Sequence, residues 1–292
     1  MTELKDLQTR DNPTWCPGCG DYGIQAAVKG AIVAAGLSPA ETVIVSGVGC
    51  GSKLPHYVRT YGLEGLHGRP LPVATGVKLA NPSLTVMAVG GDGDGYGLGM
   101  GHLVHSMRRN INITYIVQDN QIYGLTTGQT SPTSAKGTRT KSTPGGAIEM
   151  PVNPIELGLA SGATYLARGY AGDLPHLTSL IAGALKHRGF ALIDVFQPCV
   201  TFNKVNTYDF FGKRVYRLED DKTFEVATPG NEKAICEAVR RGREMGDRIP
   251  IGLFYKEDRA TYEDEEPGLA EGRPVDVGDE VVDVAGLMEG FM

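Results

Sequence analysis

The chain has 292 residues, of which 41% are hydrophobic and 21% charged, and its formal net charge is −6. This length accommodates one large α/β domain or two small ones, and the apolar fraction excludes disorder as the main state. The mild acidity, without a cluster of Lys and Arg, argues against nucleic acid as a partner. With no apolar run near the ~20 residues that cross a bilayer and no signal-peptide hydrophobic region, we expect a soluble, cytoplasmic protein.

Buried strands alternate with helices along most of the chain. The apolar residues of the strands form nearly continuous runs, which is typical of strands covered on both faces. The predicted strands are Thr42–Val48, Leu84–Gly90, Ile113–Gln118, Ala163–Leu166, Phe190–Phe196 and Ile249–Phe254. The predicted helices are Gly23–Ala35, Leu71–Leu79, Leu98–Arg108, Pro154–Ser161, Leu174–His187 and Glu232–Glu244. This alternation predicts an α/β fold with a doubly wound parallel sheet.

Two stretches depart from the alternation. Residues 124–146 are polar and rich in Gly, Ser and Thr, and loops of this length in a compact domain are usually lids or binding loops. From Asn203 the regular pattern weakens, so we expect one domain over residues 1–202 and a C-terminal extension over residues 203–292 that packs on the core and on the partner subunit. Its last part, from Asp258 to Met292, is acidic and is expected to pack on a partner or to stay mobile.

Polar and sulfur-bearing side chains follow four of the predicted strands. Because ligands bind outside the carboxyl ends of strands in open parallel sheets, these side chains are expected to meet at one edge. In chain order they are Cys50 and Lys53, then Asp92 and Asp94, then Asp119, Asn120 and Thr126, and finally Cys199. Their convergence is stronger evidence for a site than any one motif.

The glycine-rich segment Gly91–Gly101 follows a strand and opens a helix. Its glycine spacing does not give the dinucleotide pattern G-x-G-x-x-G. Asp92 in a phosphate loop would repel a diphosphate unless a divalent cation lay between them, and Mg²⁺ takes one or two protein oxygens together with phosphate oxygens. Asn120, on what should be an adjacent strand, can supply a second oxygen. A metal–diphosphate site is therefore favoured over a plain glycine turn or an NAD site.

Four cysteines are candidate ligands of a metal centre. Cys16 and Cys19 form a C-x-x-C pair, whereas Cys50 and Cys199 each stand alone after a strand. No second C-x-x-C completes a zinc ribbon, so an iron–sulfur site is favoured, with zinc or unliganded thiols as alternatives. Cys236 is expected to be a small buried hydrophobic residue of its helix.

The segment GDG at residues 91–93, followed by 26 residues and then Asn120, resembles the thiamine diphosphate-binding motif. The resemblance implies that Mg²⁺ is held on the diphosphate by the side chains of Asp92 and Asn120 and by the backbone carbonyl of Ile122.

A wider resemblance runs in order from Trp15 to Cys199. The segments WCPGCG, GCGSK, HGRPLPVATGVKLANP, GGDGDGYGLGMGHL, QDNQIYGLTTGQTSPT and QPC closely resemble the β subunit of 2-oxoacid:ferredoxin oxidoreductases. This implies a thiamine diphosphate-binding fold for residues 1–202 and a 4Fe–4S cluster on Cys16, Cys19, Cys50 and Cys199. The cofactor-binding residues that it implies are Cys50, Gly91, Asp92, Gly93, Asn120, Ile122, Gly124, Leu125 and Thr126.

The family also implies a reaction and partners. A 2-oxoacid is decarboxylated, coenzyme A takes the acyl group, and electrons pass through the cluster to ferredoxin, or the reaction runs in reverse. The CPGCGDYG opening resembles the 2-oxoglutarate branch, with pyruvate or a broad range of 2-oxoacids as the alternative. The chain resembles only the diphosphate-binding half. A larger α subunit is therefore expected to supply the pyrimidine-binding domain and an activating Glu, in a dimer of αβ pairs.

Individual roles and rival functions complete the expectations. Lys53 is a candidate for holding the substrate carboxylate, and His67 for contacting the diphosphate or the substrate. Leu125 is expected to support the bent thiamine and Thr126 to hydrogen-bond the diphosphate. The rival functions are a non-redox thiamine decarboxylase with a zinc site and a non-catalytic electron-transfer or regulatory subunit.

Overall fold

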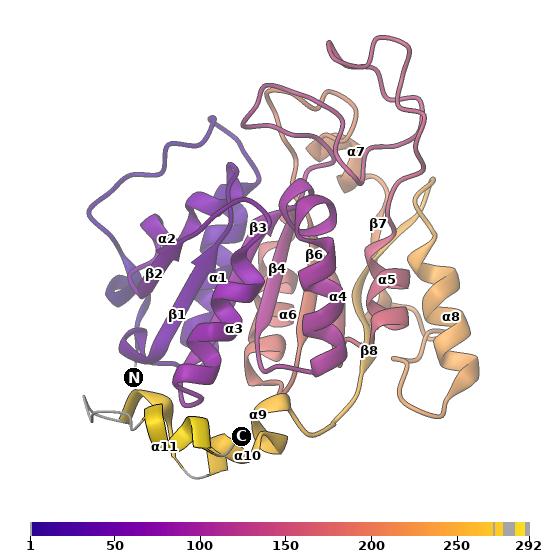
Figure 1. Cartoon of the computed structure of the whole chain (residues 1–292). Coiled ribbons are helices and arrows are strands. Elements are labelled where there is room, and N and C mark those ends of the chain that lie inside the picture. The colour runs from indigo at the N-terminus through magenta and orange to yellow at the C-terminus, as the bar shows by residue number, and fades with distance from the viewer. Residues whose placement is uncertain (1, 271, 277–283, 290–292) are drawn as a thin grey trace.

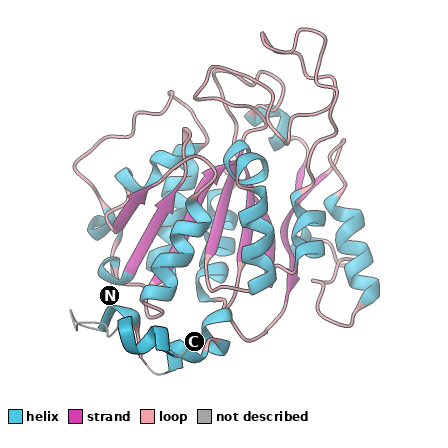
Figure 2. Cartoon of the chain, viewed as in Figure 1, coloured by secondary structure: helices cyan, strands magenta, loops and turns pink. Residues whose placement is uncertain are grey.

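The computed structural model describes residues 2–270, 272–276 and 284–289. These residues form one eight-stranded sheet in the order β2-β1-β3-β4-β6-β5-β8-β7, with helices on both faces (Figures 1 and 2). The strands are β1 Thr42–Ser46, β2 Tyr61–Glu64, β3 Thr85–Gly91, β4 Thr114–Asp119, β5 Tyr165–Tyr170, β6 Ala191–Phe196, β7 Val215–Arg217 and β8 Ile249–Lys256.

The predicted doubly wound α/β sheet is confirmed, with one correction to its direction. The six strands from β2 to β5 in the sheet order are parallel. β8 pairs with β5 in the antiparallel sense, and β7 runs parallel to β8. The reversal arises because the chain stays at the carboxyl edge after β6, through helix α7 (Tyr208–Gly212), and enters β7 from that edge.

Alternate residues of the strands face two separate hydrophobic cores. In β1, Ile44 packs with helices α1 and α6, whereas Val43 and Val45 pack on the opposite side with α3, α4, α5 and α8. This two-sided burial explains the continuous apolar runs of the sequence. The longer helices are α1 Asp21–Ala35, α3 Pro70–Ala80, α4 Met100–Arg109, α5 Pro154–Ser161, α6 Leu174–Lys186 and α8 Glu232–Gly242, each within two residues of its predicted ends. Short helices are α2 Leu54–Tyr57, α9 Tyr262–Glu265, α10 Pro267–Ala270 and α11 Val284–Glu289.

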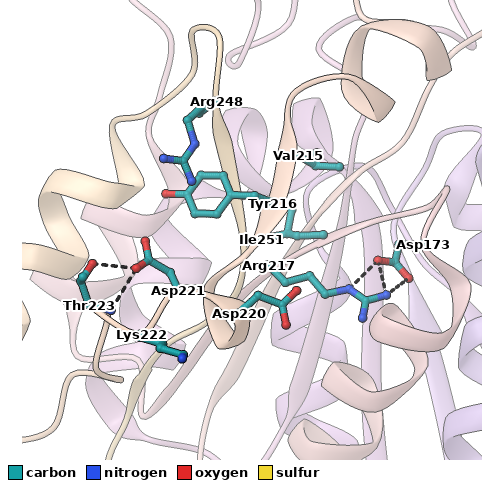
Figure 3. Close-up of a pocket in the computed structure, with 10 residues that line it drawn as sticks. All are labelled: Asp173, Val215, Tyr216, Arg217, Asp220, Asp221, Lys222, Thr223, Arg248 and Ile251. Carbon is teal, nitrogen blue, oxygen red and sulfur yellow. Dashed lines mark hydrogen bonds and ion pairs between the residues drawn. The ribbon is translucent and has the colours of Figure 1, made fainter.

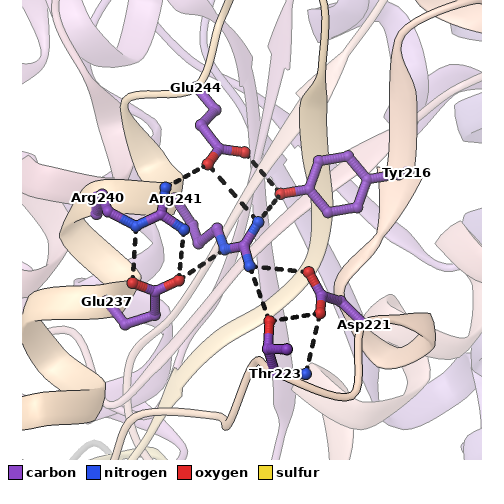
Figure 4. Close-up of polar contacts among 7 residues, drawn as sticks. All are labelled: Tyr216, Asp221, Thr223, Glu237, Arg240, Arg241 and Glu244. Carbon is purple, nitrogen blue, oxygen red and sulfur yellow. Dashed lines mark hydrogen bonds and ion pairs between the residues drawn. The ribbon is translucent and has the colours of Figure 1, made fainter.

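A buried guanidinium joins the C-terminal part to the sheet. Arg241 of α8 donates hydrogen bonds to the Tyr216 hydroxyl of β7 and to the carboxylates of Asp221 and Glu237, each at 2.8 Å (Figure 4). A buried charge is tolerated when it is paired and hydrogen-bonded in this way. Residues after 203 thus add two strands to the same sheet, while the boundary predicted at 202/203 stays a prediction.

The acidic C-terminal stretch differs from the expectation over its first residues. Glu263 accepts hydrogen bonds from the backbone amide of Asn112 at 3.1 and 3.3 Å, and Arg188 pairs with Asp264. Residues 258–266 therefore pack on this chain itself, at the end of the sheet opposite α7 (Figure 1). Residues 277–283 and 290–292 lie outside the described part of the chain. Across the described ranges, no helix is long and apolar enough to span a membrane.

Candidate cofactor cavity and cysteine cavity

The loops that follow β1, β3 and β4 meet at the carboxyl edge of the sheet around a cavity of about 90 Å³. His67 lines this cavity. So does every residue that was predicted to bind the cofactor, namely Cys50, Gly91, Asp92, Gly93, Asn120, Ile122, Gly124, Leu125 and Thr126. The parallel topology explains the convergence, because neighbouring strands deliver their following residues to the same edge.

Asp92 follows the last residue of β3 and is almost completely buried, with 2% of its surface exposed. Its Oδ2 accepts hydrogen bonds from the hydroxyls of Thr133, at 2.6 Å, and Ser131. Burial raises the pKa of Asp92 to about 6, and these hydrogen bonds act in the opposite direction. The carboxylate is thus held in one orientation, and a cation beside it would favour its ionised form.

Asn120 and Ile122 form a tight turn after β4. The Asn120 side-chain oxygen accepts the backbone amide of Ile122 at 3.1 Å, and Gln121 between them has a positive φ of 58°. This turn and Asp92 line the same cavity. The three oxygen donors that were predicted for Mg²⁺ are therefore brought to one site, and their role as ligands stays a prediction.

Asp94 organises the loops around the cavity. Its Oδ1 accepts the backbone amides of Gly68, at 2.7 Å, and Val48, at 3.1 Å, and burial raises its pKa. The Nδ1 of His67 lies 3.8 Å from the same oxygen. Asp94 therefore joins the loop after β3 to those after β1 and β2.

All four cysteines of the predicted cluster line a second cavity, of about 200 Å³. Lys53 lines it as well, with its Nζ donating to the Thr14 hydroxyl at 3.2 Å. The two cavities share four wall residues, which are Cys50, Asn120, Gly124 and Leu125. Gly124 lies between the thiols and the cofactor cavity, since a Cβ on it would lie 3.5 Å from the Sγ of Cys199 and 3.9 Å from that of Cys50.

Two thiols of the second cavity are held in their protonated form by their surroundings. Burial raises the pKa of Cys50 to about 11 and that of Cys19 still further, with the Asp21 carboxyl adding to both shifts. Cysteine ligates metal as a thiolate, so a positively charged metal centre is needed to deprotonate these groups. The described residues contain no group of three His, Cys, Asp or Glu side chains that could hold a metal ion.

Cys236 is exposed on α8, so the prediction that it is buried is wrong. The buried positions of that helix are Ala234, Ala238, Arg241 and Gly242, which repeat at intervals of three to four residues, and Cys236 lies off this face.

Several residues of the site were not predicted from the sequence. Asp21, the first residue of α1, is 1% exposed, and its Oδ2 accepts the Cys19 thiol at 3.3 Å. Thr133 and Ser131 hold Asp92, and Gln197 contacts Cys19. The available signals were the position of Asp21 directly after CPGCG and the location of Ser131 and Thr133 in the long loop that was predicted to be functional.

Four residues that line the cofactor cavity have buried polar atoms without hydrogen-bond partners. Among the described residues, Asp21 Oδ1, His67 Nδ1, Asp94 Oδ2 and Gln118 Oε1 are buried without a hydrogen-bond partner, and all four residues line the cavity. Leaving such an atom unsatisfied costs about 1–3 kcal/mol, so a hydrogen-bond donor that reached one of the three oxygens would be stabilised.

A larger cavity of about 620 Å³ lies beside β7 (Figure 3). Its wall includes the ion pair of Arg217 and Asp173, at 2.8 Å, and Arg248 above the Tyr216 ring at 4.1 Å. None of the predicted site residues lines it. The predicted site residues therefore line the two smaller cavities at the carboxyl edge of the sheet.

Comparisons with known proteins agree with this geometry. Residues 45–195 match the family model of the thiamine pyrophosphate enzyme C-terminal TPP-binding domain, and residues 199–271 match that of the C-terminal part of the pyruvate ferredoxin oxidoreductase β chain. The chain is 48% identical over 255 residues to the β subunit of the 2-oxoacid:ferredoxin oxidoreductase of Saccharolobus solfataricus, a match covering 85% of this chain and 84% of that protein. The chain belongs to the 2-oxoacid:ferredoxin oxidoreductase β-subunit family.

Two further similarities lie within the 2-oxoglutarate branch of this family. The 2-oxoglutarate oxidoreductase subunit KorB of Mycobacterium tuberculosis is 45% identical over 297 residues, covering 89% of this chain and 79% of that protein. A solved 2-oxoglutarate:ferredoxin oxidoreductase from Magnetococcus marinus superposes with a TM-score of 0.86 at 38% identity, covering 100% of this β subunit and 96% of that chain. The family resemblance stated from the sequence is confirmed.

Proposed function

We propose that this chain is the catalytic β subunit of a 2-oxoglutarate:ferredoxin oxidoreductase. The reaction converts 2-oxoglutarate, coenzyme A and two oxidised ferredoxins to succinyl-CoA, CO₂, a proton and two reduced ferredoxins, or runs in reverse. The observation that carries the proposal is the shared wall between the cofactor cavity and the four-cysteine cavity. The related M. marinus structure, described with 2-oxoglutarate, coenzyme A and succinyl-CoA bound, supports the choice of substrate over pyruvate.

The cofactor cavity contains oxygen ligands that suit Mg²⁺ bound to thiamine diphosphate. Asp92, Asn120 and the carbonyl of Ile122 would hold the metal, which in turn neutralises the diphosphate. When bound, thiamine diphosphate supplies carbanion stabilisation for decarboxylation of the 2-oxoacid. Leu125, which lines both cavities, is the apolar residue that would support the thiamine, and Gly124 leaves room beside the thiols.

The cysteine cavity fits a 4Fe–4S cluster better than a single zinc ion. A single ion draws its ligands within bonding distance of one point, whereas a cluster holds four thiolates at the corners of a larger body. Four cysteines line one cavity of about 200 Å³, which provides thiols for all four corners of such a body. The wall shared with the cofactor cavity would make the electron-transfer distance short.

The cofactor site needs a second subunit. A cavity of about 90 Å³ is small compared with the 300–1,000 Å³ typical of small-molecule sites, so this chain builds only one side of it. We infer that a larger α subunit supplies the pyrimidine-binding domain and the activating Glu, in a dimer of αβ pairs. The proposed electron acceptor is ferredoxin, and the proposed compartment is the cytoplasm, which is consistent with five free cysteines.

Three further residues have proposed roles in this site. Lys53 lines the cysteine cavity, as Leu125 does, and would hold the substrate carboxylate. His67 and Thr126 line the cofactor cavity and would contact the diphosphate, although the Thr126 hydroxyl now donates to Gln129 at 2.5 Å. Diphosphate binding would therefore require this hydroxyl to exchange its partner.

Metal and sulfide analysis tests the proposal directly. The complex of this chain with its α partner, purified without oxygen, should contain about four irons and four sulfides per β subunit. Ferredoxin reduction should depend on coenzyme A, with kcat/KM for 2-oxoglutarate above that for pyruvate. Zinc without sulfide would support the non-redox alternative, and a preference for pyruvate would overturn the substrate.

Thr133 is expected to position the metal ligand Asp92. Replacing Thr133 with valine preserves the side-chain shape but removes a hydroxyl that lies 2.6 Å from Asp92 Oδ2 and also 2.6 Å from Asp119 Oδ1. Loss of a bond that supports a metal ligand typically costs 10–100-fold in metal affinity. We expect the Kd of the cofactor-depleted complex for thiamine diphosphate with Mg²⁺, measured by calorimetry, to rise by about that factor.

Thr140→Val provides a matched control in the same loop. The Thr140 hydroxyl bonds with Ser142 and Thr143, which are also loop residues, so its removal should leave the Kd unchanged. Equal affinities of the Thr133→Val variant and the wild-type complex would contradict the positioning role.

A further inference from the structure

Gln197 connects the end of one strand to a cysteine that is distant in the sequence. It follows β6 directly and lies two residues before Cys199. Its Nε2 donates hydrogen bonds to the Sγ of Cys19 at 3.0 Å and to the backbone carbonyl of Pro198 at 3.3 Å. Gln197 is 1% exposed and Cys19 is 7% exposed, so this N–H···S contact is shielded from water.

The neighbouring groups fix which end of the Gln197 amide faces the sulfur. The carbonyl of Pro198 is an acceptor only, so the amide nitrogen must lie on its side. The Cys19 thiol donates a hydrogen bond to Asp21 Oδ2 at 3.3 Å, so the lone pairs of its sulfur are free to accept a hydrogen bond from Gln197. The reverse amide orientation would place Gln197 Oε1 against another carbonyl oxygen.

This bond becomes stronger when the sulfur carries charge. A thiolate bound to iron has no S–H group and cannot donate a hydrogen bond to Asp21, but it is a better hydrogen-bond acceptor than the thiol. One-electron reduction of a cluster adds further negative charge, part of which resides on its sulfur ligands. A donor aimed at Cys19 therefore stabilises the reduced state more than the oxidised state, and hydrogen bonds to sulfur are among the factors that set cluster potentials.

We propose that Gln197 is a positioning residue that raises the reduction potential of the cluster through its hydrogen bond to Cys19. The inference rests on the proposed function, because it requires Cys19 to be a cluster ligand. The contact also joins the C-x-x-C segment to the strand end that carries Cys199, so one amide influences the placement of two ligands and the charge on one of them, Cys19. Asp21, which accepts a hydrogen bond from the Cys19 thiol, is left unchanged by the test.

The test measures the midpoint potential of the cluster in the anaerobic αβ complex, by redox titration followed with electron paramagnetic resonance. Gln197→Leu removes the donor at similar volume. A bond worth about 1.4 kcal/mol more in the reduced state corresponds to a tenfold change in the one-electron equilibrium constant, which is 59 mV. We therefore expect the Gln197→Leu midpoint to be more negative than that of the wild type by up to about 59 mV.

Gln25→Leu is the matched control. Gln25 lies on α1, and its Nε2 donates to the carbonyl of Tyr57 at 2.9 Å instead of to a sulfur, so the same substitution should leave the midpoint unchanged. A Gln197→Leu complex with a loaded cluster and the wild-type midpoint overturns the inference and leaves the proposed function intact. A wild-type complex without iron and sulfide overturns both.

A measurement on the wild type covers the case in which the Gln197→Leu variant fails to assemble. With glutamine labelled by 15N in its side-chain amide, electron–nuclear double resonance on the reduced cluster should show a 15N coupling. The Gln25→Leu variant should retain this coupling, since Gln197 is unchanged in it. A loaded, reduced wild-type cluster without the coupling would contradict the N–H···S bond.

Discussion

Replacing Asp92 with alanine should abolish retention of thiamine diphosphate and all 2-oxoacid-dependent activity, while iron and sulfide stay at the wild-type content. Asp92 is the one carboxylate among the three proposed metal donors, and its loss leaves a neutral amide and a carbonyl to hold a divalent cation. Loss of a hydrogen bond that supports a metal ligand costs 10–100-fold in affinity, so loss of the ligand itself should cost more than about 100-fold. The cluster should survive because Asp92 does not line the cysteine cavity.

Calorimetric titration with thiamine diphosphate and Mg²⁺, paired with iron and sulfide analysis, checks this result. Asp92→Asn retains one oxygen at the same place and should bind with intermediate affinity. In the wild type, the pKa of about 6 at Asp92 means that protons compete with the metal below that pH, so affinity should fall about tenfold per unit of further acidification. Full activity in Asp92→Ala would instead support a non-catalytic electron-transfer subunit.

The extent to which the sequence predicts this fold depends on the burial of each strand. Continuous apolar runs locate six strands because each of them is buried on both faces. The strand predicted over Ala163–Leu166 overlaps β5, Tyr165–Tyr170, by only two residues, because the buried Arg168 interrupts the apolar run. β2 was missed because all four of its residues are exposed, and β7 because it has only three residues. The direction of β8 could not be predicted, since it follows from the route of the irregular segment between β6 and β7.

Some contacts of the site could be predicted from the sequence and others could not. Asp92 and Asn120 could be brought together from the sequence, because adjacent parallel strands end at a common edge. Thr133 could not, because its contact with Asp92 spans 41 residues and depends on how the long loop folds back over the cavity. Gln197 was likewise hidden, since its partner Cys19 lies 178 residues away and nothing in either local pattern indicates the contact.

Replacing Cys199 with serine should have the complementary effect, leaving thiamine diphosphate bound while ferredoxin reduction is lost. Cys199 is 9% exposed, and its Sγ lies near Gly124 on the wall that the two cavities share. A serine hydroxyl is a harder and weaker ligand for iron than a thiolate, so the cluster should be lost or altered.

We expect ferredoxin reduction in the Cys199→Ser complex to fall by more than about 100-fold, the scale expected when a metal ligand is removed, while the Kd for thiamine diphosphate stays near the wild-type value. Cys236→Ser is the matched control, because Cys236 is exposed on α8 and does not line the cysteine cavity, so all of these quantities should stay unchanged. The Asp92 variant should lose the cofactor and keep the cluster, and the Cys199 variant should do the reverse. Such a result would assign decarboxylation and electron transfer to the two cavities on either side of the wall at Gly124. Wild-type CoA-dependent ferredoxin reduction in Cys199→Ser would show that electrons leave the cofactor site without a cluster ligated by this cysteine.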